Sequence, residues 1–305
     1  MTQAAAGLVS KAELNGLFPP GFKAAQRLQI EVDQGPPAGF EMPRFGPFEI
    51  EDARPRQAQA RSEADFFDRH GFVLLSHETA VRDWEVTADA AETSEVARLY
   101  YPEIEQMVRQ RLLPGKRVEV HQKAAPLRRG RGTSTPQYAN GVHSDYGTTP
   151  DDFQISVEAF AGPQAGQGWR RSYERDEVEA FMMIDFWRPT NMAGPLDHMP
   201  LALCDPTSVE VEDLVPTAMT GIAPTGLPTN HVALRYNSGQ RWYYYPAMRT
   251  DEVLAFKLIE CRKVDSAPSV FRSVFHTAFA DPATPADAEQ RQSCEHRVAV
   301  VILRD

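Results

Sequence analysis

The sequence predicts a mostly β protein with flanking helices, built on a jelly-roll core. Segments with helical spacing of apolar residues lie before about residue 116, and short segments typical of strands dominate after it. The chain has 305 residues, of which 42% are hydrophobic and 24% charged, which is ordinary for a globular protein with a sizeable core. No internal repeat of fixed period is present, so a repeat architecture is not expected.

Residues 1–60 are rich in Pro, Gly, Ala and Gln and show little hydrophobic periodicity. Three motifs with Pro and Gly interrupt the segment: Pro19–Gly21, Gly35–Pro37 and Pro43–Phe48. We expect an extended arm that wraps the domain and is anchored by its aromatic side chains. Residues 61–305 are expected to form a single domain, with the jelly-roll core starting at about residue 116.

Helical patterns follow this arm. Residues Ser62 to His70 resemble a short capped helix that stops at Gly71, and the apolar run Phe72–Leu75 then predicts a buried strand. A second helix is expected from Pro102, which suits the first turn of a helix, to the breaking pair at residues 114–115. These helices should flank the sheets.

The remainder of the chain is expected to supply about eight strands. The predicted segments are Arg117–Val120, Phe153–Val157, Glu179–Phe186, His231–Tyr236, Arg241–Tyr245, Glu252–Lys257, Val274–Phe279 and His296–Leu303. The turn-forming residues Asn237–Gln240 predict that His231–Tyr236 and Arg241–Tyr245 form a hairpin.

Charge and cysteine content limit the location and the partners. The net charge of −10 disfavours nucleic acid or an anionic membrane as partner, because both require a basic surface. No apolar run approaches the roughly 20 residues that span a bilayer, and the first residues lack the pattern of a secretory signal. The three cysteines (Cys204, Cys261 and Cys294) are odd in number and widely spaced, which argues against a disulfide framework or a thiolate zinc site. We expect a cytoplasmic protein with a small-molecule substrate; the sequence carries no signal for an oligomeric state.

The segment Asn140–Tyr146 contains the first candidate metal ligands, His143 and Asp145. In a strand, residues two apart project to the same face, so both side chains can reach one point. One imidazole and one carboxylate supply two of the three ligands of a 2-His-1-carboxylate iron site. The His-x-Asp tripeptide alone is a weak signal, because it arises often by chance.

The third candidate ligand is His276, in the strand-like run Val274–Phe279. Fifteen residues later Arg291 is followed by Ser293, and this spacing resembles the pattern of iron(II)/2-oxoglutarate oxygenases. A dicarboxylate that chelates iron at one end needs its far carboxylate held by a bidentate cation, which Arg291 can provide with assistance from the Ser293 hydroxyl. Arg297 is the alternative anchor. The other six histidines have no partner at ligand spacing and are expected to be surface or core residues.

A longer set of motifs resembles the hydroxylase/desaturase family of secondary-metabolite pathways, which includes gibberellin-desaturase-like and cephamycin 7-alpha-hydroxylase-like proteins. The motifs are Phe186–Pro189, Pro200–Asp205, Asp213–Val215, Arg235–Asn237, Arg241–Pro246, Asp251–Lys257 and His276–Pro282. The resemblance covers roughly residues 65–303 and implies a double-stranded β-helix (cupin-like) core, Fe(II), 2-oxoglutarate as cosubstrate, and O2. Two departures are Asp185, where relatives tend to have Asn, and the stretch Leu258–Arg262; both are expected near the pocket.

Four aromatic or basic residues are candidates for the substrate cavity: Trp187, Arg188, Trp242 and Tyr243. Core packing is the competing interpretation for each aromatic residue. The basic run Arg128–Arg131 is expected in a solvated loop, with a clamp for an acidic substrate as the alternative.

These features together predict a non-heme iron, 2-oxoglutarate-dependent dioxygenase. The expected reaction is hydroxylation, desaturation or ring formation on a small secondary metabolite or amino-acid-derived substrate. The alternatives are a 2-oxoglutarate-independent iron oxidase, another metal-dependent enzyme on the same fold, and a non-catalytic barrel module. The Arg-x-Ser motif argues against the first two, and the intact ligand set argues against the third.

Overall fold

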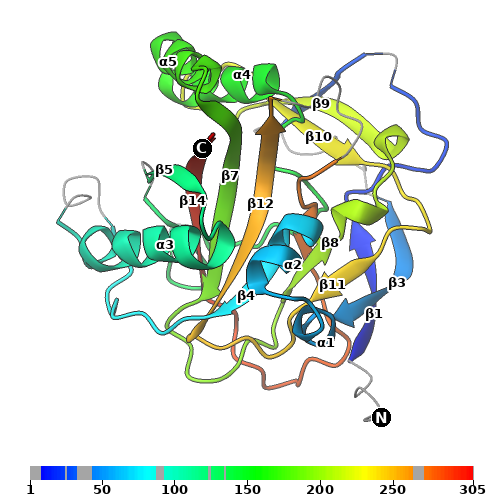
Figure 1. Cartoon of the computed structure of the whole chain (residues 1–305). Coiled ribbons are helices and arrows are strands. Elements are labelled where there is room, and N and C mark those ends of the chain that lie inside the picture. Colours follow the sequence, from blue (N-terminus) through cyan, green and yellow to red (C-terminus); the bar gives the residue numbers. More distant parts are fainter. Residues whose placement is uncertain are drawn as a thin grey trace.

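The computed structural model describes residues 8–24, 26–32, 43–86, 93–122, 125–133, 135–263 and 271–304 (Figure 1). The motif at residues 35–37 lies outside the described residues. Within the described ranges, no helix combines the length and apolar character needed to cross a membrane.

The largest sheet has the strand order β4-β12-β7-β14-β5, with the short β6 also paired to β14, and all of its pairs are antiparallel. Its long central strands alternate between two faces, so every second side chain points into the domain. The strands are β4 (Phe72–Ser76), β5 (Arg117–His121), β6 (Leu127–Arg129), β7 (Val178–Pro189), β12 (Glu252–Arg262) and β14 (Ser293–Leu303).

The domain has two further sheets, with the orders β1-β3-β11-β8-β13 and β10-β9-β2. Their strands are β1 (Val9–Asn15), β2 (Leu28–Glu31), β3 (Arg44–Asp52), β8 (Leu201–Cys204), β9 (Leu214–Thr220), β10 (Thr229–Leu234), β11 (Trp242–Tyr244) and β13 (His276–Ala278). One hydrophobic core joins Phe186 and Leu254 of the large sheet to Leu203 and Tyr243 of the five-stranded sheet, so these two sheets pack face to face. This curled arrangement of mostly strands confirms the predicted mostly β, jelly-roll fold class.

The N-terminal segment pairs more closely with the domain than the expected arm. Strand β1 pairs with β3, β3 runs parallel to β11, and β2 runs parallel to β9. Aromatic contacts do anchor it: the Phe45 ring stacks on Tyr236 at 5.1 Å between centroids, and Phe48 packs edge-on against Trp242 at 5.8 Å. The Pro and Gly content of residues 1–60 gives no local indication of these strands, because they are stabilised by pairing with distant strands rather than by local propensity.

The predicted helix before Gly71 is confirmed as α2 (Glu63–His70). The Ser62 hydroxyl accepts a hydrogen bond from the Asp65 N–H, and Gly71 adopts the left-handed conformation that ends the helix. The second predicted helix is also present, as α3 with π-helical turns on both sides. The bounds are α1 (Arg54–Ala58), η2 (Val96–Tyr100), α3 (Tyr101–Met107) and η3 (Val108–Leu112), with short 3₁₀ turns η4 (Pro206–Ser208) and η5 (Val211–Asp213).

The predicted strand Phe153–Val157 is wrong, because these residues lie in helix α4 (Pro150–Ala161). Thr149 and Asp152 form a reciprocal capping box, and Pro150 occupies the first helical position. Five residues are too few to distinguish the period of a strand from that of a helix. The capping box and Pro150 are the local signals that indicate a helix. A second helix, α5 (Pro163–Glu174), packs on α4 and was not predicted.

The predicted hairpin is also wrong. Strand β10 pairs with β9, whereas β11 lies between β3 and β8 in the other sheet. Both strands exist, and residues 235–241 between them carry the chain from one sheet to the other. A turn signature does not specify which strands pair.

Candidate metal centre

The structure brings His143, Asp145 and His276 together although 130 residues lie between the last two along the chain. His276 opens β13, and its backbone forms an antiparallel bridge with His143, with N···O distances of 3.2 and 3.1 Å. The segment with His143 is extended but is not the regular strand that the spacing predicted. One potential ligand atom from each of the three side chains lies within 4.8 Å of the others.

Backbone carbonyls orient both imidazoles. His143 Nδ1 lies 2.7 Å from the Gly141 carbonyl, and His276 Nδ1 lies 3.1 Å from the Val274 carbonyl. A carbonyl only accepts, so each Nδ1 carries the proton and each Nε2 keeps its lone pair. The ring centroids are 4.3 Å apart. Both Nε2 atoms are therefore prepared to act as ligands.

Electrostatics set the charge state of the triad. Burial, followed by the neighbouring His143, lowers the pKa of His276 to about 3. Burial raises the pKa of Asp145, but Arg297 and the two histidines outweigh it and hold that pKa below its ordinary value. Two imidazoles and an ionised carboxylate form the donor set of a divalent first-row metal site with open positions, so these residues fit Fe(II).

Arg297 of β14 fixes the carboxylate. Its Nη2 lies 3.1 Å from Asp145 Oδ1 and 3.5 Å from Glu295 Oε1. Burial alone would lower the pKa of Arg297, but the surrounding carboxylates and Tyr146 raise it by more. The net pKa lies above its ordinary value, so the guanidinium stays charged. Arg297 is thus already paired, and it orients a candidate ligand.

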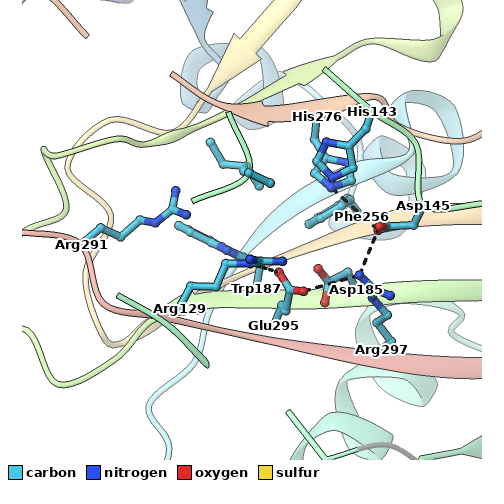
Figure 2. Close-up of a pocket in the computed structure, with 12 residues that line it drawn as sticks. Arg129, His143, Asp145, Asp185, Trp187, Phe256, His276, Arg291, Glu295 and Arg297 are labelled. Carbon is cyan, nitrogen blue, oxygen red and sulfur yellow. Dashed lines mark hydrogen bonds and ion pairs between the residues drawn. The ribbon is translucent and has the colours of Figure 1, made fainter. Parts of the chain in front are cut away.

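Arg291 has a different environment, at the other end of the cavity from Arg297 (Figure 2). Its side chain is 2% exposed, and its guanidinium lies 4.1 Å from the Tyr138 ring centroid and 5.5 Å from that of Trp187. Nη1 donates to the Met199 carbonyl at 2.6 Å, and no carboxylate of the described residues lies within 4.0 Å of it. Burial lowers the pKa of Arg291 to about 10. A buried cation without a carboxylate is the usual preparation for an anionic ligand.

Ser293, the predicted companion of Arg291, is 2% exposed at the start of β14. It is not among the residues that line the cavity between the triad and Arg291. The lining consists of Arg129, Ala139, His143, Asp145, Asp185, Trp187, Leu201, Phe256, His276, Arg291, Glu295 and Arg297.

Two charged residues of this cavity were not predicted as site residues. Arg129 comes from the basic run that was expected in solvent, and its Nε lies 3.4 Å from Glu295 Oε2. Strand alternation places Glu295 on the same face as Arg297. Asp185, noted in the sequence as a departure, also lines the cavity, and burial, followed by Glu295, raises its pKa well above the ordinary value.

The four substrate candidates are separated by the structure. Trp187 lines the cavity, but Arg188 points to the other face of β7 and donates to the His77 carbonyl at 3.0 Å. Trp242 and Tyr243 are each 1% exposed and pack in the hydrophobic core. These positions give no support to the substrate role predicted for Arg188, Trp242 and Tyr243, and agree with core packing.

His231 supports the loop between the first two candidate ligands. Its Nδ1 lies 3.2 Å from the Ser144 carbonyl, and its Nε2 lies 2.7 Å from the Thr229 hydroxyl. Burial lowers the pKa of His231. A neutral imidazole that donates to Ser144 holds the backbone between His143 and Asp145. Its predicted place in the core is consistent with this contact.

Known proteins with similar sequence and structure were found. A family model described as "Oxidoreductase/YMDC permease-like domain" matches residues 26–301. The chain is 32% identical over 125 residues to "Aspirochlorine biosynthesis protein N" of Aspergillus oryzae, covering 39% of this chain and 47% of that protein, about half of its length. It is 25% identical to "Hydroxylase/desaturase poxK" of Penicillium oxalicum, covering 95% of this chain and 90% of that protein. Other relatives are named as alpha-ketoglutarate-dependent or Fe(II)/2-oxoglutarate-dependent dioxygenases.

A solved structure has the same fold. The "iron and alpha-ketoglutarate-dependent endoperoxidase NvfI with different conformation" superposes with a TM-score of 0.65 at 21% identity, covering 99% of this chain and 100% of that one. At this identity the similarity shows the fold.

Proposed function

The chain belongs to the oxidoreductase/YMDC permease-like domain family, and we propose that it is an Fe(II)- and 2-oxoglutarate-dependent oxygenase. The observation that supports this most directly is the convergence of His143, Asp145 and His276 within 4.8 Å. Relatives that are named as hydroxylases, desaturases and dioxygenases of this cofactor class agree with it. The proposed outcome is hydroxylation, desaturation or ring formation on a small secondary metabolite, with O2 as oxidant.

In this proposal the triad holds Fe(II) through two imidazole nitrogens and one carboxylate oxygen. When bound, the metal supplies the activation of O2 that protein side chains do not provide. Burial keeps His276 neutral, and the hydrogen bonds to the Gly141 and Val274 carbonyls orient the two imidazoles. Arg297 holds Asp145 ionised and oriented, which keeps one ligand in place without occupying the open positions.

The anchor for 2-oxoglutarate is assigned to Arg291 rather than to Arg297. Arg297 already pairs with Asp145 and Glu295, whereas Arg291 has no carboxylate partner among the described residues. The Tyr138 and Trp187 rings fix the plane of the Arg291 guanidinium, and this rigidity favours bidentate binding of a carboxylate. Arg129 also lines the cavity, where it pairs with Glu295.

The three cysteines are buried and unpaired, which supports a reducing, cytoplasmic location as part of this proposal. The proposed partners are Fe(II), 2-oxoglutarate and a small organic molecule.

Iron binding tests this function. We expect His276→Ala to abolish stoichiometric Fe(II) binding, measured anaerobically by calorimetry, and with it succinate formation from 2-oxoglutarate. The matched control is His198→Ala, which removes an imidazole outside the triad and should leave iron stoichiometry unchanged. Wild-type iron stoichiometry in His276→Ala would contradict the proposal.

A further inference from the structure

A second and larger cavity lies beside the candidate metal centre and plays no part in the assignments above. It measures about 730 Å³ and lies between the inner face of the large sheet and helices α4 and α5, which cover one end of that sheet (Figure 1). Its volume is within the range of pockets that hold drug-sized organic molecules. The lining residues are His121, Tyr146, Phe153, Ser156, Val157, Phe160, Ala161, Ala165, Gly168, Trp169, Ser172, Phe181, Met183, Arg297, Ala299 and Val301.

The two helices leave this space open because of the residues on their inner faces. On α5, the lining positions Ala165, Gly168, Trp169 and Ser172 follow the spacing of one helical face, and three of the four are small. A core helix would place large apolar residues at these positions to fill the interior. A Cβ atom built on Gly168 meets only Arg171 Nη2, at 3.9 Å. The small residues on the inner face of α5 therefore leave the cavity open.

Alternation along the strands connects this cavity to the candidate metal centre. On β14, Arg297 lines both cavities, while Glu295 lines only the polar one and Ala299 only the apolar one. On β7, Asp185 lines the polar cavity and Met183 the apolar one. The same inner sheet face thus changes from charged to apolar at the level of Arg297, whose guanidinium contacts Asp145.

The chemistry of the lining restricts the ligand. Aromatic rings from both helices and from β7 form the walls, with Phe153 lying 4.7 Å from Phe181 and 4.8 Å from Trp169 between centroids. Arg297 is the single formal cation among the lining residues, and it is already paired with carboxylates. At the rim, Phe160 is 48% exposed. Such a lining selects an uncharged, largely apolar molecule with rings, and has no free charge for an acidic group.

We propose that this cavity binds the organic substrate, an uncharged apolar molecule with a ring system, between α4, α5 and the sheet. The assignment of the bound molecule as the substrate of the reaction rests on the proposed function. The substrate occupies the apolar cavity from the α4–α5 side and presents its reacting end past Arg297 to the triad. The dicarboxylate occupies the opposite, charged side near Arg291, so the two ligands do not compete for space.

Binding of a neutral fluorophore tests this inference without iron or 2-oxoglutarate. The probe is N-phenyl-1-naphthylamine, titrated into the metal-free chain. We expect saturable binding with one site per chain, and Gly168→Phe should weaken it about tenfold or more, equivalent to about 1.4 kcal/mol. Ala165→Leu fills the same cavity from the preceding turn of α5 and should also weaken binding. Added 2-oxoglutarate should not displace the probe.

The matched control is Gly21→Phe, since a Cβ on this exposed glycine meets nothing within 4 Å. It should bind the probe like the wild type. Three results would overturn the inference: no saturable binding by the wild type, wild-type affinity in both cavity variants, or a loss of affinity in Gly21→Phe as large as that in the cavity variants. Anaerobic binding of Fe(II) to the wild type is measured separately, so a failure of the proposed function is distinguishable from a failure of this cavity assignment. Thermal unfolding of each variant identifies a loss of binding that is caused by unfolding.

Discussion

Replacing Arg291 with methionine should have opposite effects on cosubstrate binding and on the stability of the free protein. Methionine keeps the apolar stem beneath Tyr138 and Trp187 but removes the buried charge. Truncating one partner of a buried, hydrogen-bonded charge pair costs about 2–5 kcal/mol of binding free energy. We therefore expect the Kd for 2-oxoglutarate to rise by roughly 30- to 5000-fold.

The free protein should respond in the other direction. The lowering of the Arg291 pKa to about 10 corresponds to a penalty of about 3 kcal/mol on the charged form in the folded state. The variant removes this penalty but loses the hydrogen bond to the Met199 carbonyl, worth about 1 kcal/mol, and a cation–π contact of similar size. The free energy of unfolding should be unchanged or higher by about 1 kcal/mol.

The assays are anaerobic calorimetric titration of 2-oxoglutarate into the Fe(II)-loaded chain and urea unfolding of the metal-free chain. Arg291→Lys should give an intermediate Kd, because lysine keeps the charge but not the planar fork. A Kd within about threefold of wild type, together with a loss of more than about 2 kcal/mol in stability, would show that Arg291 is structural and refute the reasoning.

Two further substitutions test the electrostatics of the charged cavity. Arg297→Met leaves Asp145 and Glu295 without their cation, so we expect about 10- to 100-fold weaker Fe(II) binding by calorimetry, while an unchanged Fe(II) affinity would argue against an orienting role. Asp185→Asn should raise the free energy of unfolding at pH 7 to 8. The folded-state pKa of Asp185 lies above its unfolded value, so the carboxyl group costs stability as the pH rises above about 4, where the unfolded group ionises. Urea unfolding from pH 4 to 8 should show this gain disappear toward pH 4, and a gain that is independent of pH would contradict the assignment.

The sequence predicted those parts of the site and fold that depend on local pattern and fixed spacing. The capped helix before Gly71 needs only Ser62 and a glycine, and the His143–Asp145 spacing places two side chains on one side of any extended segment. Pairing between distant strands is not encoded locally, which is why β10 and β11 were joined in a hairpin that does not form.

The apolar cavity shows a related limit. Phe153 to Val157 was interpreted as a strand, and α5 was not predicted, so the two helices that form the cavity had no place in the sequence model. The signal was present in the Thr149–Asp152 capping box and in the small residues of α5 at helical spacing. A cavity is defined by side chains that do not fill a space, and short-range periodicity does not report that space.

Charge balance in the polar cavity links the metal and cosubstrate assignments. The guanidiniums of Arg129 and Arg297 pair with Asp145 and Glu295, and burial raises the pKa of Asp185, which disfavours its charged form. Arg291 has no carboxylate within 4.0 Å among the described residues, so the excess of positive charge in the cavity lies on Arg291. A divalent cation at the triad adds to this excess, and a dicarboxylate that bridges the triad and Arg291 offsets it. Each ligand should therefore strengthen the binding of the other by the same factor, because coupling between two sites is reciprocal.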